Sequence, residues 1–314
     1  NVLTGEDLAA MSEDDLRQRI GSVNVCARIM PEQKLRLVEA LKASGEIVAM
    51  TGDGVNDAPS LKAAHIGIAM GGRGTDVARE ASAIVLLDDD FGSIVKAIRM
   101  GRRIYDNLRK AMGFIVAVHI PIAGLALLPL LTGMPLLLGP IHIAFLEMII
   151  DPVCSLAFEA EEDERNVMAR PPRRPDTSLF SRWLVGWSVI QGSLAFGVTG
   201  GLTFYFWSLG MGEEQLRSTA FLTLVLGITS LILINRRFSS SIMAALRRFN
   251  PALSVVLGLV AAILLATQFI PPIADLFNFA RVAPEEIGII ALASIVMLFV
   301  LERLKPLWGS RLLE

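Results

Sequence analysis

The chain has 314 residues, of which 53% are apolar and only 19% are charged, and its formal net charge is −2. The apolar fraction is higher and the charged fraction lower than is usual for a soluble globular protein, which indicates a membrane portion. A near-neutral chain has no electrostatic support for binding nucleic acid, so we exclude that class of partner. Two cysteines, Cys26 and Cys154, are too few for a disulfide framework.

The first 98 residues predict short helices and strands in alternation. Ser12 and Asp15 are spaced as in a capping box, which predicts a helix over 13–20. Apolar periodicity and turn residues then predict, in chain order, a strand over 23–29, a helix from Pro31 to Gly45, a strand over 46–51, a helix over 58–64, a strand over 66–70, a helix over 75–81 and a strand over 84–87. Such β-α-β units are typical of an α/β domain with a parallel sheet covered by helices.

The rest of the chain predicts an all-α transmembrane domain. Apolar residues at helical spacing predict one long helix over 91–112, whose part 99–112 would be a stalk that enters the membrane. A span needs about 20 apolar residues. Nearly uncharged runs of about this length predict six spans. The first begins at the end of the stalk, and the transmembrane domain covers 113–314. The spans lie at about 111–131, 136–158, 183–211, 218–235, 251–274 and 283–302.

Basic residues predict the orientation of these spans, because they gather in alternate connections. They are Arg102, Arg103, Arg109 and Lys110, then Arg165, Arg170, Arg173, Arg174 and Arg182, then Arg236, Arg237, Arg247 and Arg248, and finally Arg303, Lys305 and Arg311. The other connections hold only Arg217 and Arg281. Since basic residues stay on the cytoplasmic side, we expect residues 1–110 and the C-terminus in the cytoplasm of a multi-pass protein embedded in lipid, in the plasma membrane.

The segment Thr51–Pro59, with the sequence TGDGVNDAP, carries the strongest chemical signal. A strand of a parallel sheet would deliver Asp53 to its C-terminal end, where open sheets of this kind bind ligands. Gly52 and Gly54 let the backbone turn tightly and approach a ligand. The two carboxylates of Asp53 and Asp57 suit a hard cation such as Mg²⁺.

Two further side chains fit phosphoryl transfer. Asn56 can donate a hydrogen bond to a phosphate oxygen, and Lys34 can neutralise charge on a transferring phosphoryl group. An isolated Gly-Asp-Gly is more often an ordinary turn with solvated acids. Nine specified residues together with Lys34 upstream favour a Mg²⁺ and phosphate site.

These segments resemble the second half of the phosphorylation domain of P-type ATPases, in the haloacid dehalogenase superfamily. The resemblance is carried by Cys26–Arg28, Pro31–Lys34, Met50–Pro59, Leu61-Lys62, Ile66–Gly71, Val85–Asp90 and Gly101–Asn107. It implies that Asp53 ligates Mg²⁺ with the support of Asp57. It also implies that Asn56 contacts the phosphate and that Lys34 stabilises an aspartyl-phosphate. The cofactors would be Mg²⁺ and ATP, with further cofactor contacts at Thr51, Gly52 and Gly54.

The sequence also departs from the family. The phosphorylated aspartate of the family lies in the motif DKTGT, which does not occur here. The nucleotide-binding domain, the actuator domain with its TGES loop and the first four spans are not recognised either, and Thr4-Gly5-Glu6 matches that loop in letters only, as a surface turn. We therefore expect an N-terminal part of the same pump as partner, with DKTGT upstream of Asn1, and no ATP hydrolysis by this chain alone.

The second predicted span contains two acids, and ionisable residues inside a span mark function by default. Glu147 and Asp151 are four residues apart and share one helix face. Pro152 has no N–H, so the carbonyl of Met148 loses its helical partner. Two carboxylates and a carbonyl would form an oxygen site for a hard cation, unless the acids are a structural hydrogen-bonded pair. His119 in the first span is a further candidate ligand, or a hydrogen-bonding group between helices.

The membrane motif is similar to that of calcium pumps. Asp151 matches the aspartate of their Asn-x-x-x-Asp pair and Glu147 replaces the asparagine, while His119 stands where they have an asparagine. Two-ion calcium pumps carry a glutamate at the place of Ile122, so the single-site calcium pumps are the nearer likeness. The resemblance implies ATP-driven export of a divalent cation such as Ca²⁺.

Several alternatives stay open. Carboxylates and carbonyls also suit H⁺, Mn²⁺, Mg²⁺ or Na⁺ and K⁺, and the chain alone could be a non-catalytic fragment. Heavy-metal pumps of this family have two spans after the phosphorylation domain, and lipid flippases need no acidic pair, so both fit less well. We expect the acidic run Glu161–Glu164 to be a solvated loop and assign no role to Gln191.

Overall fold

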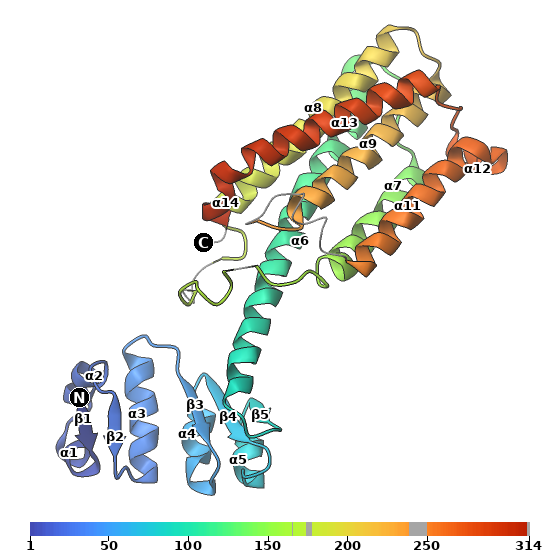
Figure 1. Cartoon of the computed structure of the whole chain (residues 1–314). Coiled ribbons are helices and arrows are strands. Elements are labelled where there is room, and N and C mark those ends of the chain that lie inside the picture. The colour runs from blue at the N-terminus through green and yellow to red at the C-terminus, as the bar shows by residue number, and fades with distance from the viewer. Residues whose placement is uncertain (165, 174–177, 239–249, 313–314) are drawn as a thin grey trace. The chain divides into compact units, whose positions relative to one another are not determined.

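The computed structural model describes residues 1–164, 166–173, 178–238 and 250–312 (Figure 1). The chain divides into two compact units, Asn1–Ile98 and Arg99–Glu314. Among the described residues, all strands belong to the first unit, and the regular elements of the second are helices. Four of the basic residues that predict orientation, Arg165, Arg174, Arg247 and Arg248, lie outside the described residues.

The first unit contains short parallel strands in two sheets. The strands are β1 (Val2–Thr4), β2 (Val25–Ala27), β3 (Ala49–Gly52), β4 (Ile66–Met70) and β5 (Ile84–Leu86). The sheet orders are β1-β2 and β3-β4-β5, and every pair is parallel. Gly52 lies opposite Ala69, so β3 and β4 end close to the same level at one edge. This edge is where the Gly-Asp-Gly turn begins.

Helices connect these strands. They are α1 (Gly5–Ala10), α2 (Glu13–Ile20), α3 (Pro31–Ala43), a 3₁₀ turn (Val55–Asp57), α4 (Ala58–Ala63) and α5 (Asp76–Ala81). Helices α2, α3, α4 and α5 begin within one residue of their predicted starts, whereas β1 and α1 were not predicted. Ser12 caps α2, because its hydroxyl accepts the amide hydrogen of Asp15 at 3.2 Å. The α/β fold with parallel strands is therefore confirmed.

Thr4-Gly5-Glu6 is not a surface turn: Thr4 ends β1 and forms a capping box with Asp7 at the start of α1.

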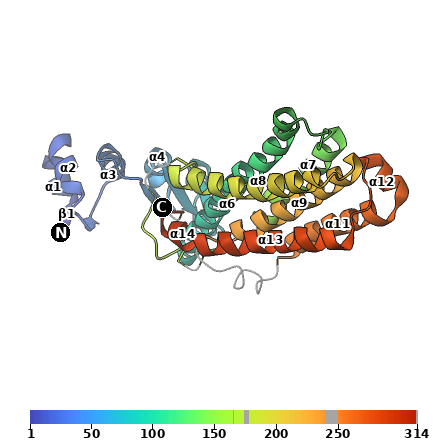
Figure 2. The same ribbon diagram turned by 90° about the horizontal axis from the view of Figure 1, so that it is seen from above.

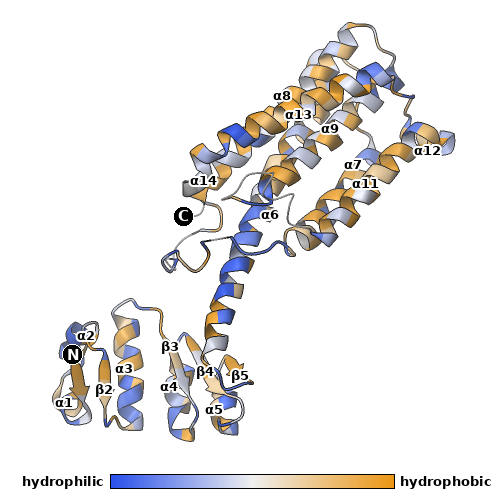
Figure 3. Ribbon diagram, viewed as in Figure 1, coloured by the Kyte–Doolittle hydropathy of each residue, from blue (hydrophilic) through white to orange (hydrophobic). Residues whose placement is uncertain are grey.

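The second unit consists of helices. They are α6 (Gly92–Thr132, which begins in the first unit), α7 (Pro140–Pro152) with a π-helical turn (Val153–Ala157), α8 (Arg182–Ser208), α9 (Glu213–Asn235), α11 (Pro251–Phe269), α12 (Pro271–Phe277), α13 (Pro284–Leu304) and α14 (Pro306–Leu312). Within the described ranges, five helices are long and apolar enough to cross a membrane: α6, α8, α9, α11 and α13. Figure 3 shows the apolar character of α11 and α13 and the polar stretch of α6.

Two expected spans are broken by proline. The segment 136–158 contains the 13-residue α7 and then the π-helical turn, because Pro152 cannot donate the next helical hydrogen bond. The segment 251–274 is two helices, α11 and α12, which meet at Ile270 directly before Pro271 and Pro272. The first segment alone accounts for the difference between the six expected spans and the five long helices found in the described residues, because α11 is itself one of the five.

Helix α9 lies at the centre of the bundle and packs against α8 and α13 (Figure 2). In its apolar window 78% of the residues are buried, against 22% in α11 and in α13, so α9 is shielded by its neighbours. Gln191 on α8 and Asn235 on α9 exchange two hydrogen bonds, at 2.7 and 3.3 Å, and both are buried. Gln191 therefore fixes the alignment of α8 against α9.

A buried ion pair joins α6 to the connection that follows the π-helical turn. Lys110 and Glu164 have fully buried side chains, and Lys110 Nζ lies 3.0 Å from Glu164 Oε1. The same carboxylate oxygen accepts the backbone amide hydrogen of Phe238, at 3.1 Å. Burial of both charges in an apolar bundle is tolerable only because each meets its partner at hydrogen-bonding distance.

Glu161 forms a second buried cluster, so the expectation that the whole run Glu161–Glu164 is solvated is wrong, although Glu162 stays exposed. Glu161 is 3% exposed, and its Oε1 accepts hydrogen bonds from Arg236 Nε at 2.6 Å and from Asn250 Nδ2 at 2.8 Å. Asn107 of α6 donates to the carbonyl of Glu161 at 2.7 Å. The acidic run therefore ties together α6, the end of α9 and the start of α11, whose residues are far from it in the sequence.

We predict that Glu164→Gln lowers the free energy of unfolding of the helical unit by about 3 kcal/mol or more, because Lys110 would stay buried without its counter-charge. Thermal unfolding of the purified chain in detergent measures the effect. The double variant Lys110→Met/Glu164→Gln should recover part of the loss. In Arg99→Met, which removes an exposed partner 3.8 Å from Asp163, the change should stay below about 1 kcal/mol. If Glu164→Gln and Arg99→Met lowered the free energy of unfolding equally, the buried ion pair would not be the cause.

Candidate functional site

Asp57 lies at the centre of the turn that follows β3. Its Oδ1 accepts a hydrogen bond from Lys34 Nζ at 2.6 Å, and its Oδ2 accepts the amide hydrogens of Asp53 and Gly54, each at 3.3 Å. Burial opposes ionisation of Asp57, but the Lys34 ammonium and the two amides outweigh it and hold the pKa of the carboxyl below its ordinary value. The site thus contains a carboxylate that is ionised and fixed in direction.

The structure places Asp53 and Asn56 differently from Asp57, because both of their side chains are exposed. Asp53 follows the last residue of β3, at the carboxyl edge of the sheet, where side chains of such sheets meet a ligand. An edge with two carboxylates and one lysine fits Mg²⁺, which binds through one or two carboxylates and completes its shell with phosphate oxygens and water. Thr51 and Gly52 at the end of β3 and Gly54 in the turn are half-buried beside these groups.

Gly52 is required by the packing of this turn. A Cβ atom at Gly52 would lie 2.5 Å from Asp57 Cβ and 2.9 Å from its Oδ2, which is closer than real atoms approach. The backbone of Gly52 therefore allows the Asp57 carboxylate to fold back over the turn and reach Lys34. The close approach is a physical reason for glycine at this position in the motif.

A glycine-rich loop over 71–75 supports the turn, and the sequence reasoning did not assign it. The amide of Thr75 donates to the carbonyl oxygen of Asp53 at 2.8 Å. The carboxylate of Asp89 accepts two amide hydrogens of the loop, at 2.8 and 3.0 Å, and Arg79 donates to two of its carbonyl oxygens, at 2.6 and 2.7 Å. The run of glycines directly after a predicted strand was the available signal for a second loop at this edge.

The four residues predicted to bind the transported ion do not form a compact cluster like that of the soluble site. Glu147, Met148 and Asp151 lie on α7, His119 lies on α6, and all four are exposed in this chain. His119 Nδ1 lies 2.8 Å from the carbonyl oxygen of Ile115 in its own helix. Over the part of the chain that the structure describes, no three or more His, Cys, Asp and Glu side chains come together as a metal-binding group. The four candidates therefore remain predicted ligands on two helices.

Comparisons with known proteins agree on one group of relatives. Residues 135–307 match the family described as "Cation transporting ATPase, C-terminus", and residues 1–65 match the haloacid dehalogenase-like hydrolases. The chain is 35% identical over 307 residues to a "Calcium-transporting ATPase" of Bacillus subtilis, an alignment that covers 96% of this chain and 34% of the relative. It is 40% identical over 222 residues to a "Probable cation-transporting ATPase F" of Mycobacterium bovis, covering 70% of this chain and 24% of the relative.

A third relative extends the same pattern. The chain is 38% identical over 228 residues to "Calcium-transporting ATPase 1" of Lactococcus lactis, with 73% of this chain and 26% of the relative covered. The chain thus spans between 24% and 34% of the length of these relatives.

We predict that Gly52→Ala lowers the free energy of unfolding of the first unit by about 1–3 kcal/mol, because the added methyl group must displace Asp57. Thermal unfolding followed by circular dichroism would measure the change. Gly21→Ala is the matched control: it adds the same methyl group at a helix end where nothing lies within 4 Å. That variant should be neutral or slightly stabilising. A similar loss in both variants would show that the Asp57 contact is not the cause.

Proposed function

Because the chain belongs to the family of P-type cation-transporting ATPases, we propose that it is the C-terminal part of an ATP-driven cation pump that works through an aspartyl-phosphate. The observation that carries this proposal is the contact of Lys34 with Asp57 at 2.6 Å in the TGDGVNDAP turn. This contact lies in the same chain as the membrane helices that match the cation-transporting family. ATP hydrolysis and ion transport would be activities of the whole pump.

The soluble residues would handle the phosphoryl group. Asp53 and Asp57 would hold Mg²⁺, which supplies neutralisation of phosphate charge, and Asn56 would donate to a phosphate oxygen. Lys34 would keep Asp57 ionised and place a positive charge beside the phosphoryl group. The exposure of Asp53 and Asn56 supports these roles, because both side chains are accessible to a ligand at the carboxyl edge of β3.

The group that becomes phosphorylated would lie outside this chain. No DKTGT motif occurs in the sequence, and an acceptor aspartate is essential for covalent phosphoryl transfer. We propose that the remaining part of the pump provides this aspartate and the nucleotide-binding surface. The chain alone would then bind Mg²⁺ and phosphate groups weakly and would not hydrolyse ATP.

The membrane residues would bind the transported ion, for which we propose a divalent cation, with Ca²⁺ first. Glu147 and Asp151 lie one turn apart on α7, and Pro152 provides no N–H for the carbonyl of Met148. These are oxygen ligands suited to a hard cation, and two of the relatives are named as calcium-transporting. His119 would complete the site from α6. The basic connections would face the cytoplasm of a cell membrane, and transport would be outward.

We predict that Asp53→Asn in the full-length pump abolishes Mg²⁺-dependent phosphorylation from ATP, because the carboxylate that ligates Mg²⁺ is lost. Labelling with radioactive ATP and acid quenching measures the phosphorylated protein. Asp14→Asn is the control, since the side chain of Asp14 is 88% exposed on another helix, and it should phosphorylate normally. Retained phosphorylation in Asp53→Asn would overturn the assignment of the soluble site.

We predict that Asp151→Asn removes the ion dependence of ATPase activity in the full-length pump, because one of the charged oxygen ligands is lost. ATPase rates should be compared across Ca²⁺, Mn²⁺, Mg²⁺, Na⁺, K⁺ and pH, which also distinguishes Ca²⁺ from the other cations. Asp275→Asn, an exposed acid on α12, should keep the behaviour of the wild type. An unchanged ion dependence in Asp151→Asn would exclude this site.

A further inference from the structure

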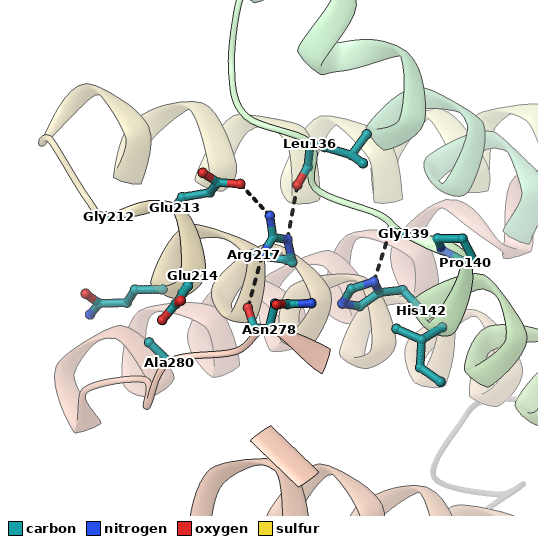
Figure 4. Close-up of a pocket in the computed structure, with 12 residues that line it drawn as sticks. Leu136, Gly139, Pro140, His142, Gly212, Glu213, Glu214, Arg217, Asn278 and Ala280 are labelled. Carbon is teal, nitrogen blue, oxygen red and sulfur yellow. Dashed lines mark hydrogen bonds and ion pairs between the residues drawn. The ribbon is translucent and has the colours of Figure 1, made fainter. Parts of the chain in front are cut away.

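A cavity of about 700 Å³ lies where α7 and α9 begin and α12 ends (Figure 4). Arg217 of α9 crosses it and is held by three groups. Its guanidinium donates to the carbonyl oxygens of Leu136 and Asn278, each at 3.1 Å, and to the carboxylate of Glu213 at 2.6 Å. The linker before α7 and the linker after α12 are therefore both fastened to the start of α9.

His142 forms the second attachment at this cavity. The amide of Gly139 donates to His142 Nδ1 at 2.9 Å, and His142 Nε2 lies 3.1 Å from the carbonyl oxygen of Phe277. An amide can only donate and a carbonyl can only accept, so Nδ1 carries no proton and Nε2 carries one. The observed pair of hydrogen bonds thus requires the neutral ring, in one tautomer. It ties the first turn of α7 to the end of α12.

The surroundings of His142 favour the neutral ring. The side chain is 2% exposed and packs against the rings of Phe221, Phe277 and Phe279, with centroids 5.1–5.6 Å away. A protonated ring would add a positive charge to this apolar contact, on the wall of a cavity that already holds Arg217.

The charged groups of the neighbouring elements are few. Helix α9 contributes Arg217 with Glu213 and Glu214, which also line the cavity. Helix α12 carries Asp275, and the linker after it carries Arg281, whose guanidinium lies over the ring of Phe269 at 5.4 Å. Glu213 is already paired with Arg217. The first turn of α7 has no acidic or basic residue other than His142 itself.

We propose that His142 is a positioning residue that makes the start of α7 responsive to acid on the side of the membrane where this cavity opens. The proposal rests on the proposed pump function, because α7 is the helix that carries Glu147 and Asp151. Protonation of Nδ1 turns an acceptor into a donor that faces the N–H of Gly139. The first turn of α7 then loses the bond that closes it, and the attachment to α12 is weakened.

The direction of the effect follows from the neutral ring in the attached state. An ordinary histidine is neutral above about pH 6.5, so the attachment is fully present at neutral and alkaline pH. It is lost progressively as the pH falls. The extra proton fits only when His142 has released Gly139 and Phe277, so acid favours this released state. Acid on the cavity side should therefore loosen the linker before α7 and slow the pump, and return to neutral pH should reverse the effect.

Glutamine provides the test variant. In His142→Gln the amide oxygen can accept from Gly139 and the amide nitrogen can donate to Phe277, but the group does not titrate. His142→Ala removes both bonds at every pH. His65→Gln is the matched control, because His65 Nδ1 accepts the amide hydrogen of Val48 at 3.1 Å in the first unit.

The full-length pump should be reconstituted in vesicles with the cavity side facing the lumen, and ion uptake measured at luminal pH 7.5 and 5.5. We expect the wild type and His65→Gln to slow by about threefold or more at acid pH, since a histidine released from its buried contacts gains its proton within this range. His142→Gln should change by less than about 1.5-fold, because glutamine has no titrating group there. His142→Ala should be slow at both pH values. A wild-type pH profile in His142→Gln, or normal uptake by His142→Ala at pH 7.5, would overturn the proposal.

Hydrogen exchange separates this proposal from the pump function on which it rests. Amide exchange over 133–139, followed by mass spectrometry, should accelerate at acid pH in the wild type after correction for the intrinsic rate. It should not accelerate in His142→Gln. If the wild type transports none of the tested cations but shows this difference, the pump proposal fails and the role of His142 stands. If transport occurs without the difference in exchange, the role of His142 fails alone.

Discussion

The cost of burying charge in an apolar interior determines how this chain is built. A buried ion without its partner costs several kcal/mol, so each charge inside the helical unit has to meet an opposite charge or a set of hydrogen-bonding groups. Lys110 meets Glu164, and Arg236 meets Glu161, in pairs with nearly no exposed surface. These pairs join segments that are distant in the sequence. The middle of α6, the connection after α7, the end of α9 and the start of α11 thus depend on one set of charges.

The same constraint separates structural from functional groups. In the soluble unit, Lys34 and Asp57 satisfy each other at 2.6 Å, whereas Asp53 and Asn56 remain exposed at the edge of the sheet. In the helical unit, the acid Glu147 is exposed on α7, while Glu161 and Glu164 of the following connection are buried and paired. Groups that are already paired hold the fold, and accessible polar groups on a rigid element are the ones that a ligand can reach.

Local features of the sequence predicted much of the soluble unit. The cap at Ser12, the proline at the start of α3 and the short apolar runs are each read from neighbouring residues, and the elements formed where these signals lie. The TGDGVNDAP turn was recognised in the same way.

The burial of Glu161 could not be predicted, because its partner Arg236 is 75 positions away. The tie of His142 to Phe277 spans 135 positions and leaves no mark in local periodicity. The assembly of Glu147, Asp151 and His119 into an ion site stays a prediction.

Polar contacts at the two ends of helix α7 fix the position of Glu147 and Asp151, the two acids predicted to bind the transported ion. At its first turn, His142 and the backbone amide of Gly139 fix it to the end of α12. At its other end, Pro152 and the π-helical turn lead into the connection whose Glu161 and Glu164 are buried against α6 and α9. Glu147 and Asp151 lie between these two attachments. A helix held at both ends transmits a displacement of either end to its middle, because its backbone hydrogen bonds resist compression and bending. The position of the acid pair therefore depends on polar contacts that are made outside the pair itself.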